Sequence, residues 1–367
     1  MAPSRVYVAS LIALWLAVPA PGGPKKNPNE LPQVVPSKKK EKQEATQVLP
    51  AAKEPPRAVV AETARLDYVV TPLSGKGLLS QQARDALKWL LSGNRGAIIK
   101  LRAFVAGTGD VRRIQDIVSE MFTDKHLPLP TLSVAQVGAL PLEGAQVVIE
   151  ATTQDKEIIN PNGVAFMSAQ RGTRKDPVGA LQLALREAGV EAAGVRRVTC
   201  FVSSLDYVTR AREQVAQTYP DAAADFVQVL RGPLEDFIEC EAVGAAPKAP
   251  PEGVTFLNPQ AGVFSESAIV GPIRVAITGT QLGFRTEDAD LRLAFDRLGK
   301  TLESVGASYK RVVFAQVYAL LRTTGEKVNK MRYDYHGKQV APAGTSVLFE
   351  GLPGIDTSFG IDVIAAL

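Results

Sequence analysis

One order of apolar segments occurs three times along this chain. Three runs, IIKLRAFVAG (98–107), VRRVTCFVSS (195–204) and KRVVFAQVYA (310–319), each precede a segment with helical periodicity. A second run follows in every unit, namely SVAQVGALP (133–141), DFVQVLRGP (225–233) and TSVLFEGLP (345–353). A closing run ends each unit, namely AQVVIEAT (145–152), DFIECEAV (236–243) and SFGIDVIAAL (358–367). A repeat constrains the architecture more than any single residue does, because each unit must be the same supersecondary unit.

The units predict three domains over 64–152, 155–247 and 252–367, each with strand, helix, strand, helix and two closing strands. The helices of each unit have one apolar face, as in Leu181, Ala184, Leu185 and Ala188 after a start at Asp176 and Pro177. We therefore expect an α/β (α+β) fold, with a mixed sheet covered by two helices on one face. The uncovered sheet faces must be buried by neighbouring units.

The first 63 residues have a different composition. Residues 1–20 contain Arg5 and the apolar run 6–18, which predicts a signal peptide. Because Pro21 would hinder cleavage, an uncleaved anchor is the alternative. Residues 21–63 are rich in Pro and Lys and predict a disordered linker. Residues 1–63 hold nine Lys or Arg and five Asp or Glu, which equals the whole chain's net charge of +4. The remainder is therefore neutral, which argues against nucleic-acid binding.

Cys200 and Cys240 are the two cysteines, on predicted neighbouring strands of the second unit. Both alternate with apolar residues, so both are expected to face one core. An exported protein could join them in a disulfide, but a bridge between adjacent strands is geometrically awkward. We favour a pair of buried thiols over the bridge.

Several motifs resemble the RidA/YjgF family of reactive-intermediate deaminases. The third unit carries NPQAGVFSESAIVG (258–271), VAITGTQLG (275–283) and LGKTLESVGAS (298–308), and the others resemble it through SVAQVGALP, FVQV (226–229) and IECEAV (238–243). The resemblance implies a chorismate-mutase-like domain. Because the family usually forms homotrimers with ligand clefts between subunits, three units in one chain imply an intrachain pseudo-trimer.

The resemblance also implies site residues, most of which this chain lacks. The family's carboxylate-binding Arg corresponds to Leu132, Ala224 and Gly344, none of which has a guanidinium group. Arg231 is a candidate to reach the site instead. The family Tyr corresponds to Phe264.

The family's catalytic Glu is matched by Glu239 alone, because Val148 and Gly360 occupy its place in the other units. We interpret Glu239 as a sheet-face carboxylate first and as a catalytic residue second. His126 and His336 are expected to be solvated loop residues. The scattered histidines and cysteines indicate no metal site, and we expect no cofactor.

Three hypotheses follow. The favoured one is an exported RidA-like protein, periplasmic or extracellular, that lacks the standard deaminase activity. Such a protein would bind a small carboxylate or imine-like metabolite at clefts between domains, or act as a structural or interaction module. The alternative is a 2-iminobutanoate/2-iminopropanoate deaminase with a relocated site. Ribonuclease activity is third, because the folded part is neutral. We expect a monomer with trimer-like internal packing, no nucleic-acid partner and no stable membrane span after signal removal.

Overall fold

The computed structural model of this chain describes residues 52–93, 96–107, 109–232, 235–259, 264–337 and 341–367. The predicted signal peptide and most of the predicted linker lie outside these residues. The predicted linker boundary at residue 63 is wrong, because Ala58–Glu62 form strand β1, which pairs with β12 (Arg274–Thr278). Among the described residues, none of the helices is long and apolar enough to cross a membrane.

We call residues 64–152, 155–247 and 252–367 segments 1, 2 and 3. Segment 1 contains β2 (Leu66–Val70), α1 (Leu79–Gly93), β3 (Ala97–Ala106), α2 (Arg113–Asp124), β4 (Thr131–Val137) and β5 (Val147–Gln154). Segment 2 contains β6 (Val164–Arg171), α3 (Gly179–Glu187), β7 (Val195–Val202), α4 (Val208–Thr218), β8 (Ala223–Gln228) and β9 (Ile238–Ala245).

Segment 3 is longer at its N-terminal end. It contains β10 (Val254–Pro259), β11 (Ser265–Val270), β12, β13 (Gln281–Phe284), α5 (Asp288–Ser304), β14 (Val312–Ala319), α6 (Arg322–His336), β15 (Ala343–Leu348) and β16 (Thr357–Ala366). Short 3-10 turns at Thr63–Arg65, Ala192–Gly194, Leu205–Tyr207 and Tyr309–Arg311 complete the described elements.

The three segments share one strand order. It is β2-β5-β3-β4 in segment 1, β6-β9-β7-β8 in segment 2, and β12 or β13, then β16-β14-β15, in segment 3. In each segment the last two strands of this order are parallel and the other pairs are antiparallel. The predicted mixed α and β fold class is confirmed at this level. Strand β11 joins the strands of segments 2 and 3 by pairing with β6 and β15.

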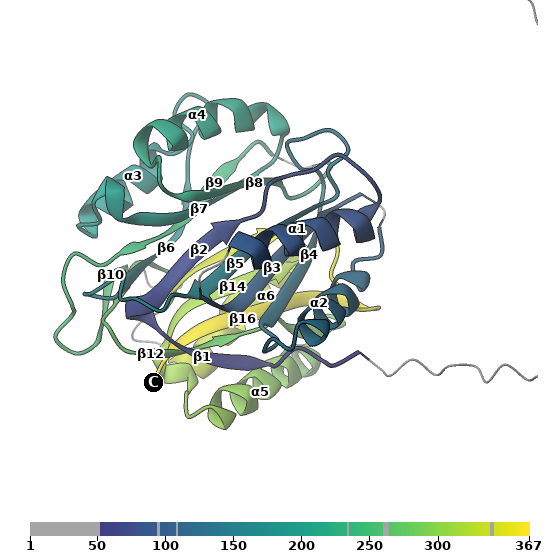
Figure 1. Ribbon diagram of the computed structural model, residues 1–367. Helices are drawn as coiled ribbons and strands as arrows, with labels where there is room; N and C mark the ends of the chain where they lie inside the picture. The colour runs from purple at the N-terminus through teal and green to yellow at the C-terminus, as the bar shows by residue number, and fades with distance from the viewer. Residues whose placement is uncertain (1–51, 94–95, 108, 233–234, 260–263, 338–340) are drawn as a thin grey trace, which may run out of the picture. The chain divides into compact units, whose positions relative to one another are not determined.

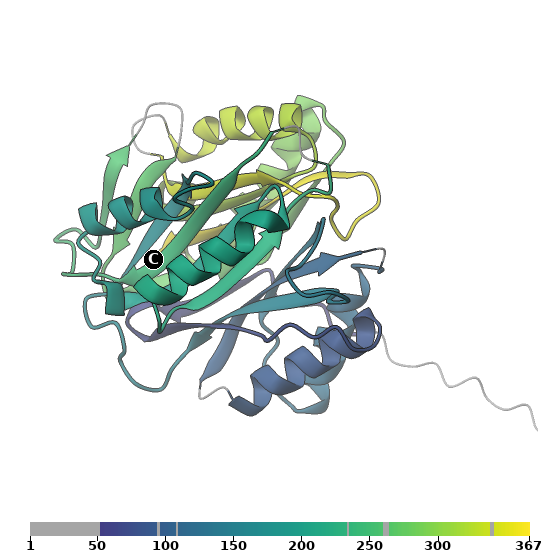
Figure 2. The same ribbon diagram turned by 90° about the horizontal axis from the view of Figure 1, so that it is seen from above.

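The helices lie outside the strands, as Figures 1 and 2 show for each segment in turn. Three apolar cores lie between helices and strands, one for each segment. The predicted helix face Leu181, Ala184, Leu185 and Ala188 belongs to the core of segment 2. The predicted start of that helix is wrong, because α3 begins at Gly179, after Asp176 and Pro177.

Two further apolar cores take residues from all three segments. One contains Tyr68, Phe166 and Phe314. The other contains Phe104, Phe201 and Tyr318. The centroids of these three rings lie 5.2 to 6.1 Å from the centroid of the Phe349 ring. The sheet faces away from the helices are therefore buried against one another, which removes apolar surface from water without a partner chain.

The favoured interpretation of the cysteines is wrong. Cys200 on β7 and Cys240 on β9 are directly opposed in the ladder, with Cα atoms 4.1 Å apart, and they form a disulfide. Both are fully buried in the core of segment 2. The bridge therefore links two neighbouring strands inside a single segment.

Candidate functional sites at the junctions of the three segments

Each junction between two segments contains a cavity. The first cleft, between segments 1 and 2, has a volume of about 570 Å³. The second cleft, between segments 2 and 3, has a volume of about 260 Å³. The third cleft, between segments 3 and 1, has a volume of about 490 Å³. Each is lined by the second strand of the parallel pair of one segment (β8, β15 or β4) and by strands of the neighbouring segment. Cavities of this size suit small ligands.

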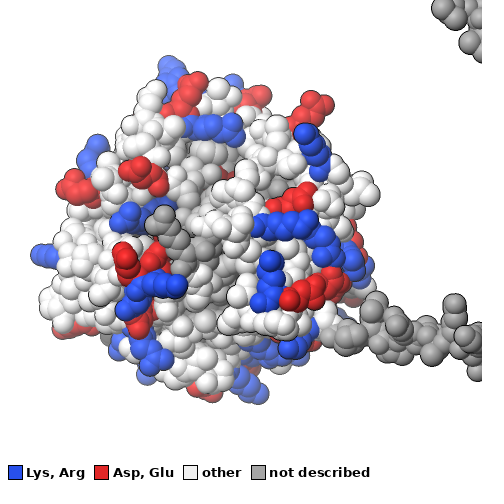
Figure 3. All heavy atoms as spheres, in the orientation of Figure 1, with Lys and Arg blue, Asp and Glu red and all other residues white. Residues whose placement is uncertain are grey.

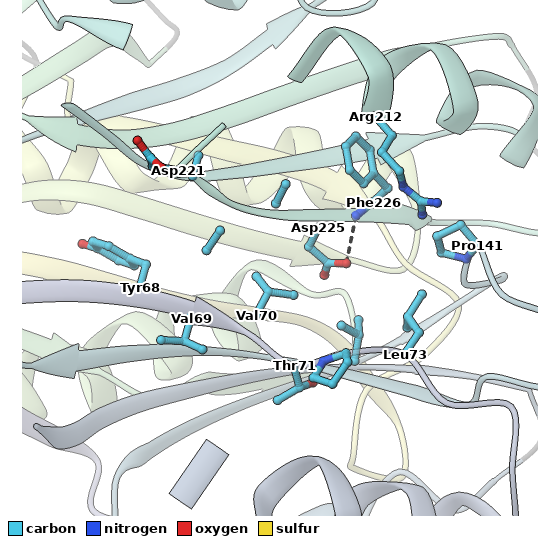
Figure 4. Close-up of a pocket in the computed structure, with 15 residues that line it drawn as sticks. Tyr68, Val69, Val70, Thr71, Leu73, Pro141, Arg212, Asp221, Asp225 and Phe226 are labelled. Atoms are coloured by element: carbon cyan, nitrogen blue, oxygen red, sulfur yellow. Dashed lines mark hydrogen bonds between the residues drawn. The ribbon is translucent and has the colours of Figure 1, made fainter. Parts of the chain in front are cut away.

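The first cleft lies between β8 and the strand and loop of residues 68–73 (Figure 4). Val69, Val70 and Leu73 give it an apolar wall. The Asp225 side chain is only 3% exposed. Its Oδ1 atom accepts a hydrogen bond from the backbone N–H of Phe226 at 2.8 Å. Burial, together with the nearby Glu150 carboxylate, raises the pKa of Asp225 to about 7.

The second cleft contains Glu239, the one residue that matches the family's catalytic Glu. Burial raises the pKa of its carboxyl group, and Glu235 adds to this, although Arg171 opposes it. Across the cleft, Asn329 on α6 donates a hydrogen bond to the Ser346 hydroxyl on β15 at 3.2 Å. A carboxyl group with a raised pKa beside hydrogen-bonding side chains can act as a general acid or base.

Two arginines line the same cleft, and both pair with the single carboxylate of Glu235. Arg322 Nη2 lies 2.9 Å from Glu235 Oε1, and Arg171 Nη2 lies 3.7 Å from that atom. All three side chains are more than half exposed. Their mutual attraction is therefore weakened by water, and either guanidinium group can exchange this partner for a ligand.

The third cleft is lined partly by residues 54–57, which precede β1. Leu132 lines it from β4, and the backbone carbonyl of Leu132 accepts a hydrogen bond from Thr280 N–H at 3.1 Å. In this cleft the chain's own N-terminal segment occupies part of the wall.

The structure does not bring the predicted site residues together. Leu132 lines the third cleft, Ala224 the first and Glu239 the second. Arg231 does not line the second cleft among the described residues; its backbone N–H donates to Glu350 Oε1 at 2.5 Å. Arg171 and Arg322 line the second cleft together with Glu239, but neither stands at the place of the family's Arg.

The place of the family Arg in segment 3 is closed by packing. A Cβ atom on Gly344 would lie 2.5 Å from the Phe264 ring and 2.3 Å from the Ala315 carbonyl oxygen. The guanidinium group of Arg332, from α6, stacks on the other predicted site residue, Phe264, with Cζ 3.6 Å from the ring centroid. Arg332 is 1% exposed and does not line the second cleft. It fills the interior rather than offering a carboxylate-binding fork.

A layer of buried charges, which the sequence motifs did not indicate, lies where the three segments meet. Arg102 on β3 forms ion pairs with Glu150 of its own segment and, at 2.8 Å, with Glu241 of segment 2. Arg102 also donates to the Thr199 hydroxyl at 3.0 Å and to the Gln316 side-chain oxygen at 3.3 Å. One guanidinium group thus contacts all three segments.

The remaining charges of this layer are also paired. Lys100 Nζ lies 2.7 Å from Asp362 Oδ1, and Arg197 Nη2 lies 3.0 Å from Glu241 Oε1. Ser133 and Tyr318 donate hydrogen bonds to Asp362 at 2.6 and 2.9 Å. Burial lowers the pKa of Lys100, although Asp362 opposes the shift. Pairing of this kind offsets the free-energy cost of burying these charges.

The ladder register shows that this layer uses the same positions in each segment. Opposite Arg102 stand Ser133 and Glu150. Opposite Thr199 stand Asp225 and Glu241, and opposite Gln316 stand Thr345 and Asp362. Each segment therefore contributes one carboxylate from its last strand. A sequence signal did exist, because charged side chains recur at one place in otherwise apolar strands.

Metal chemistry receives no support from the residues that the structure describes, which contain no group of three His, Cys, Asp or Glu side chains placed to hold an ion. On the face shown in Figure 3, Lys and Arg side chains alternate with Asp and Glu, without a large area of one sign.

Neither a family model nor a curated protein matches this chain. Similar solved structures include a YjgF/YER057c/UK114 family member from Mycobacterium tuberculosis (18% identity, 31% of this chain and 99% of that chain, TM-score 0.24). They also include RidA from Psychrobacter sp. PAMC 21119 (20%, 25% and 80%, TM-score 0.23) and a putative endoribonuclease L-PSP from Entamoeba histolytica (18%, 31% and 99%, TM-score 0.24). These names belong to the family that the sequence motifs resemble. At such TM-scores the likeness carries no argument about activity.

Proposed function

We propose that this chain is an exported protein of three RidA-like domains, closed as an intrachain pseudo-trimer, that binds a small metabolite at the clefts between its domains. The proposed domains are segments 1, 2 and 3. Their common strand order, the corresponding positions of the charge layer and the alternation of the three clefts support a closed arrangement.

One observation carries the claim that the clefts bind rather than catalyse in the family's manner. Each junction holds a cavity, but Leu132, Ala224 and Gly344 stand where the family has its Arg. Without that guanidinium group, a substrate carboxylate has no bidentate partner at this position. The ligand class that we propose is a small carboxylate or imine-like metabolite.

Export is part of the same proposal. The apolar run near the N-terminus supports it, and so does the disulfide between Cys200 and Cys240, because disulfides persist mainly in oxidising compartments. Reduced cysteines in protein isolated from its natural compartment would argue against this part of the proposal.

The test of binding uses pyruvate as a probe, with titration followed by calorimetry and by amide chemical shifts. We expect saturable binding, with shifts confined to strands that line the clefts. We also expect no acceleration of 2-iminopropanoate hydrolysis when this substrate is generated by a coupled enzyme. Failure of pyruvate and of related small carboxylates and imine analogues to bind would contradict the proposal.

A deaminase with a relocated site is the second candidate, and the second cleft favours it. Glu239 has a raised pKa there and shares the cavity with Arg171 and Arg322. If this candidate holds, wild-type protein accelerates 2-iminopropanoate hydrolysis, and Glu239→Gln lowers kcat by about 100-fold or more.

Glu235→Gln is the matched control, because it removes a carboxylate from the same cleft while releasing the two arginines. We expect it to lower KM and to change kcat far less than Glu239→Gln does, because Glu235 makes only a minor contribution to the raised pKa of Glu239. Equal losses in both variants would show that charge in the cleft matters without assigning a catalytic role to Glu239.

A further inference from the structure

The junction of segments 1 and 2 is held differently from the other two junctions. At the second junction β6 pairs with β11 over four residue positions, and the Ser168 hydroxyl accepts a hydrogen bond from Gly344 N–H. At the third, β1, which directly precedes segment 1, pairs with β12 of segment 3 over five positions. At the first junction, β2 and β8 face each other across the first cleft without pairing as strands. An isolated β-bridge between Ala139 and Gln228 lies beyond the cleft.

Asp225 stands at a position where the other segments have a hydroxyl group. Ser133 and Thr345 occupy the corresponding places, as the register with Arg102 and Gln316 shows. The Ser133 hydroxyl donates across the third junction to Asp362 at 2.6 Å. The carboxylate that corresponds to Asp362 on the far side of the first junction is Glu150. A hydroxyl can donate to a carboxylate, whereas an ionised Asp225 cannot.

The Asp225 carboxyl group has one unpartnered oxygen. Its Oδ2 atom is buried and has no hydrogen-bond partner among the described residues, while Oδ1 accepts from Phe226 N–H. The charged groups that act on it are Glu150 on β5, Arg102 on β3 and Arg197 on β7. Tyr68 on β2 and two exposed groups of segment 2, Arg212 on α4 and Asp221, line the same cleft (Figure 4).

The cations near Asp225 already pair with other carboxylates, although the Nε atom of Arg197 has no hydrogen-bond partner among the described residues. Arg102 pairs with Glu150 and Glu241, and Arg197 pairs with the same two carboxylates. An ionised Asp225 would therefore add a fourth carboxylate to a layer whose three carboxylates match three cations. A buried negative charge without its own partner is strongly unfavourable.

We propose that Asp225 is a proton-operated latch of the first cleft. With a proton on Oδ2 the side chain takes the donor role that the Ser133 hydroxyl has at the third junction, and β8 stays closed against β2 and β5. Loss of the proton sets Asp225 against Glu150 at the junction that lacks a strand ladder, and the cleft opens. Ligand entry to this cleft, under the proposed function, then depends on pH.

The direction in which pH changes the opening of the first cleft follows from linkage between proton binding and opening. In the closed state the pKa of Asp225 is about 7, and in the open state the carboxyl group meets water and has its ordinary, lower pKa. The closed state therefore binds the proton more tightly. The opening equilibrium rises about tenfold for each pH unit between the two pKa values and becomes level above the higher one.

The test is amide hydrogen exchange in the full chain from pH 5 to pH 8, corrected for the intrinsic rate. Amides of β2 and β8 are compared with amides of β6 and β11 at the second junction. We expect the opening equilibrium of β2 and β8 to rise about tenfold per pH unit from pH 5 to 7 and to level off above pH 7. The amides of β6 and β11 should show no such trend.

Two variants and one control complete the test. Asp225→Asn and Asp225→Ser, which cannot ionise, should give opening that is independent of pH, whereas Asp221→Asn should keep the wild-type dependence. The same pH trend in Asp225→Asn as in wild type, or a trend shared by all junctions, would overturn the latch. If the variants do not fold, titration of the Asp225 carboxyl carbon by NMR in wild-type protein decides: a midpoint below pH 5 overturns it. None of these readouts uses a ligand, so failure of the latch and failure of metabolite binding are distinguishable.

Discussion

At the scale of single residues, His336 shows how burial changes the role of a side chain. The prediction of a solvated loop residue is wrong, because His336 is the last residue of α6 and is 9% exposed. Its Nδ1 atom lies 3.2 Å from the Tyr309 carbonyl oxygen, and its ring packs edge-on against the Tyr309 ring. Burial lowers the pKa of His336 to about 4.

A prediction about stability follows from this shift. Because the folded state holds His336 neutral and the unfolded state protonates it near pH 6.5, stability is lost as pH falls from about 6.5 to 4. Urea unfolding should show that wild type loses on the order of 2 kcal/mol more than His336→Gln between pH 7 and 4.5. His126→Asn, at an exposed loop position, is the matched control. An equal pH dependence in wild type and His336→Gln would contradict the burial argument.

At the scale of secondary-structure elements, the disulfide ties β7 to β9 in the core of segment 2. Its loop of about 40 residues includes α4 and β8. Closing such a loop restricts the unfolded chain, so the Cys200→Ala, Cys240→Ala double variant should lose about 2 to 4 kcal/mol of unfolding free energy. Reductant should lower the melting temperature of wild type and leave that of the double variant unchanged. A melting temperature insensitive to reductant in wild type would show that the bridge is absent in solution.

The sequence predicted elements better than it predicted pairings between them. The apolar faces of helices and the order of helices and strands along the chain depend on local periodicity. Leu181 and Ala184 lie in the core of segment 2, as that periodicity indicates. The cysteine pair was misjudged because a bridge between adjacent strands was expected to be geometrically awkward, whereas Cys200 and Cys240 are directly opposed in the ladder and form the bridge. The start of α3 lies at Gly179, two residues after the Asp176-Pro177 signal, because local signals fix a helix boundary only to within one or two residues.

At the scale of the whole molecule, the chain buries its sheets against one another around a layer of ions. The recurrence of polar side chains in apolar strands marks Arg102, Glu241 and Gln316, but it does not indicate that they meet, since they are distant in sequence. The repeat did indicate that the free sheet faces need partners. The residues that line each cleft could be identified only from the three-dimensional packing. The same holds for Phe264 and Arg332, which fill the interior beside Gly344.

The closed arrangement requires that separate segments meet at this charged centre, and a double-mutant cycle between Arg102 and Glu241 measures that contact. Arg102→Gln, Glu241→Gln and the double variant are compared by unfolding free energy. The exposed pair Arg292 and Asp334, 2.8 Å apart within segment 3, is the control. We expect each central single variant to lose about 3 to 5 kcal/mol, with a coupling energy above about 1 kcal/mol that exceeds that of the control. Additive losses within about 0.5 kcal/mol would mean that segments 1 and 2 do not meet there, and would contradict the closed arrangement.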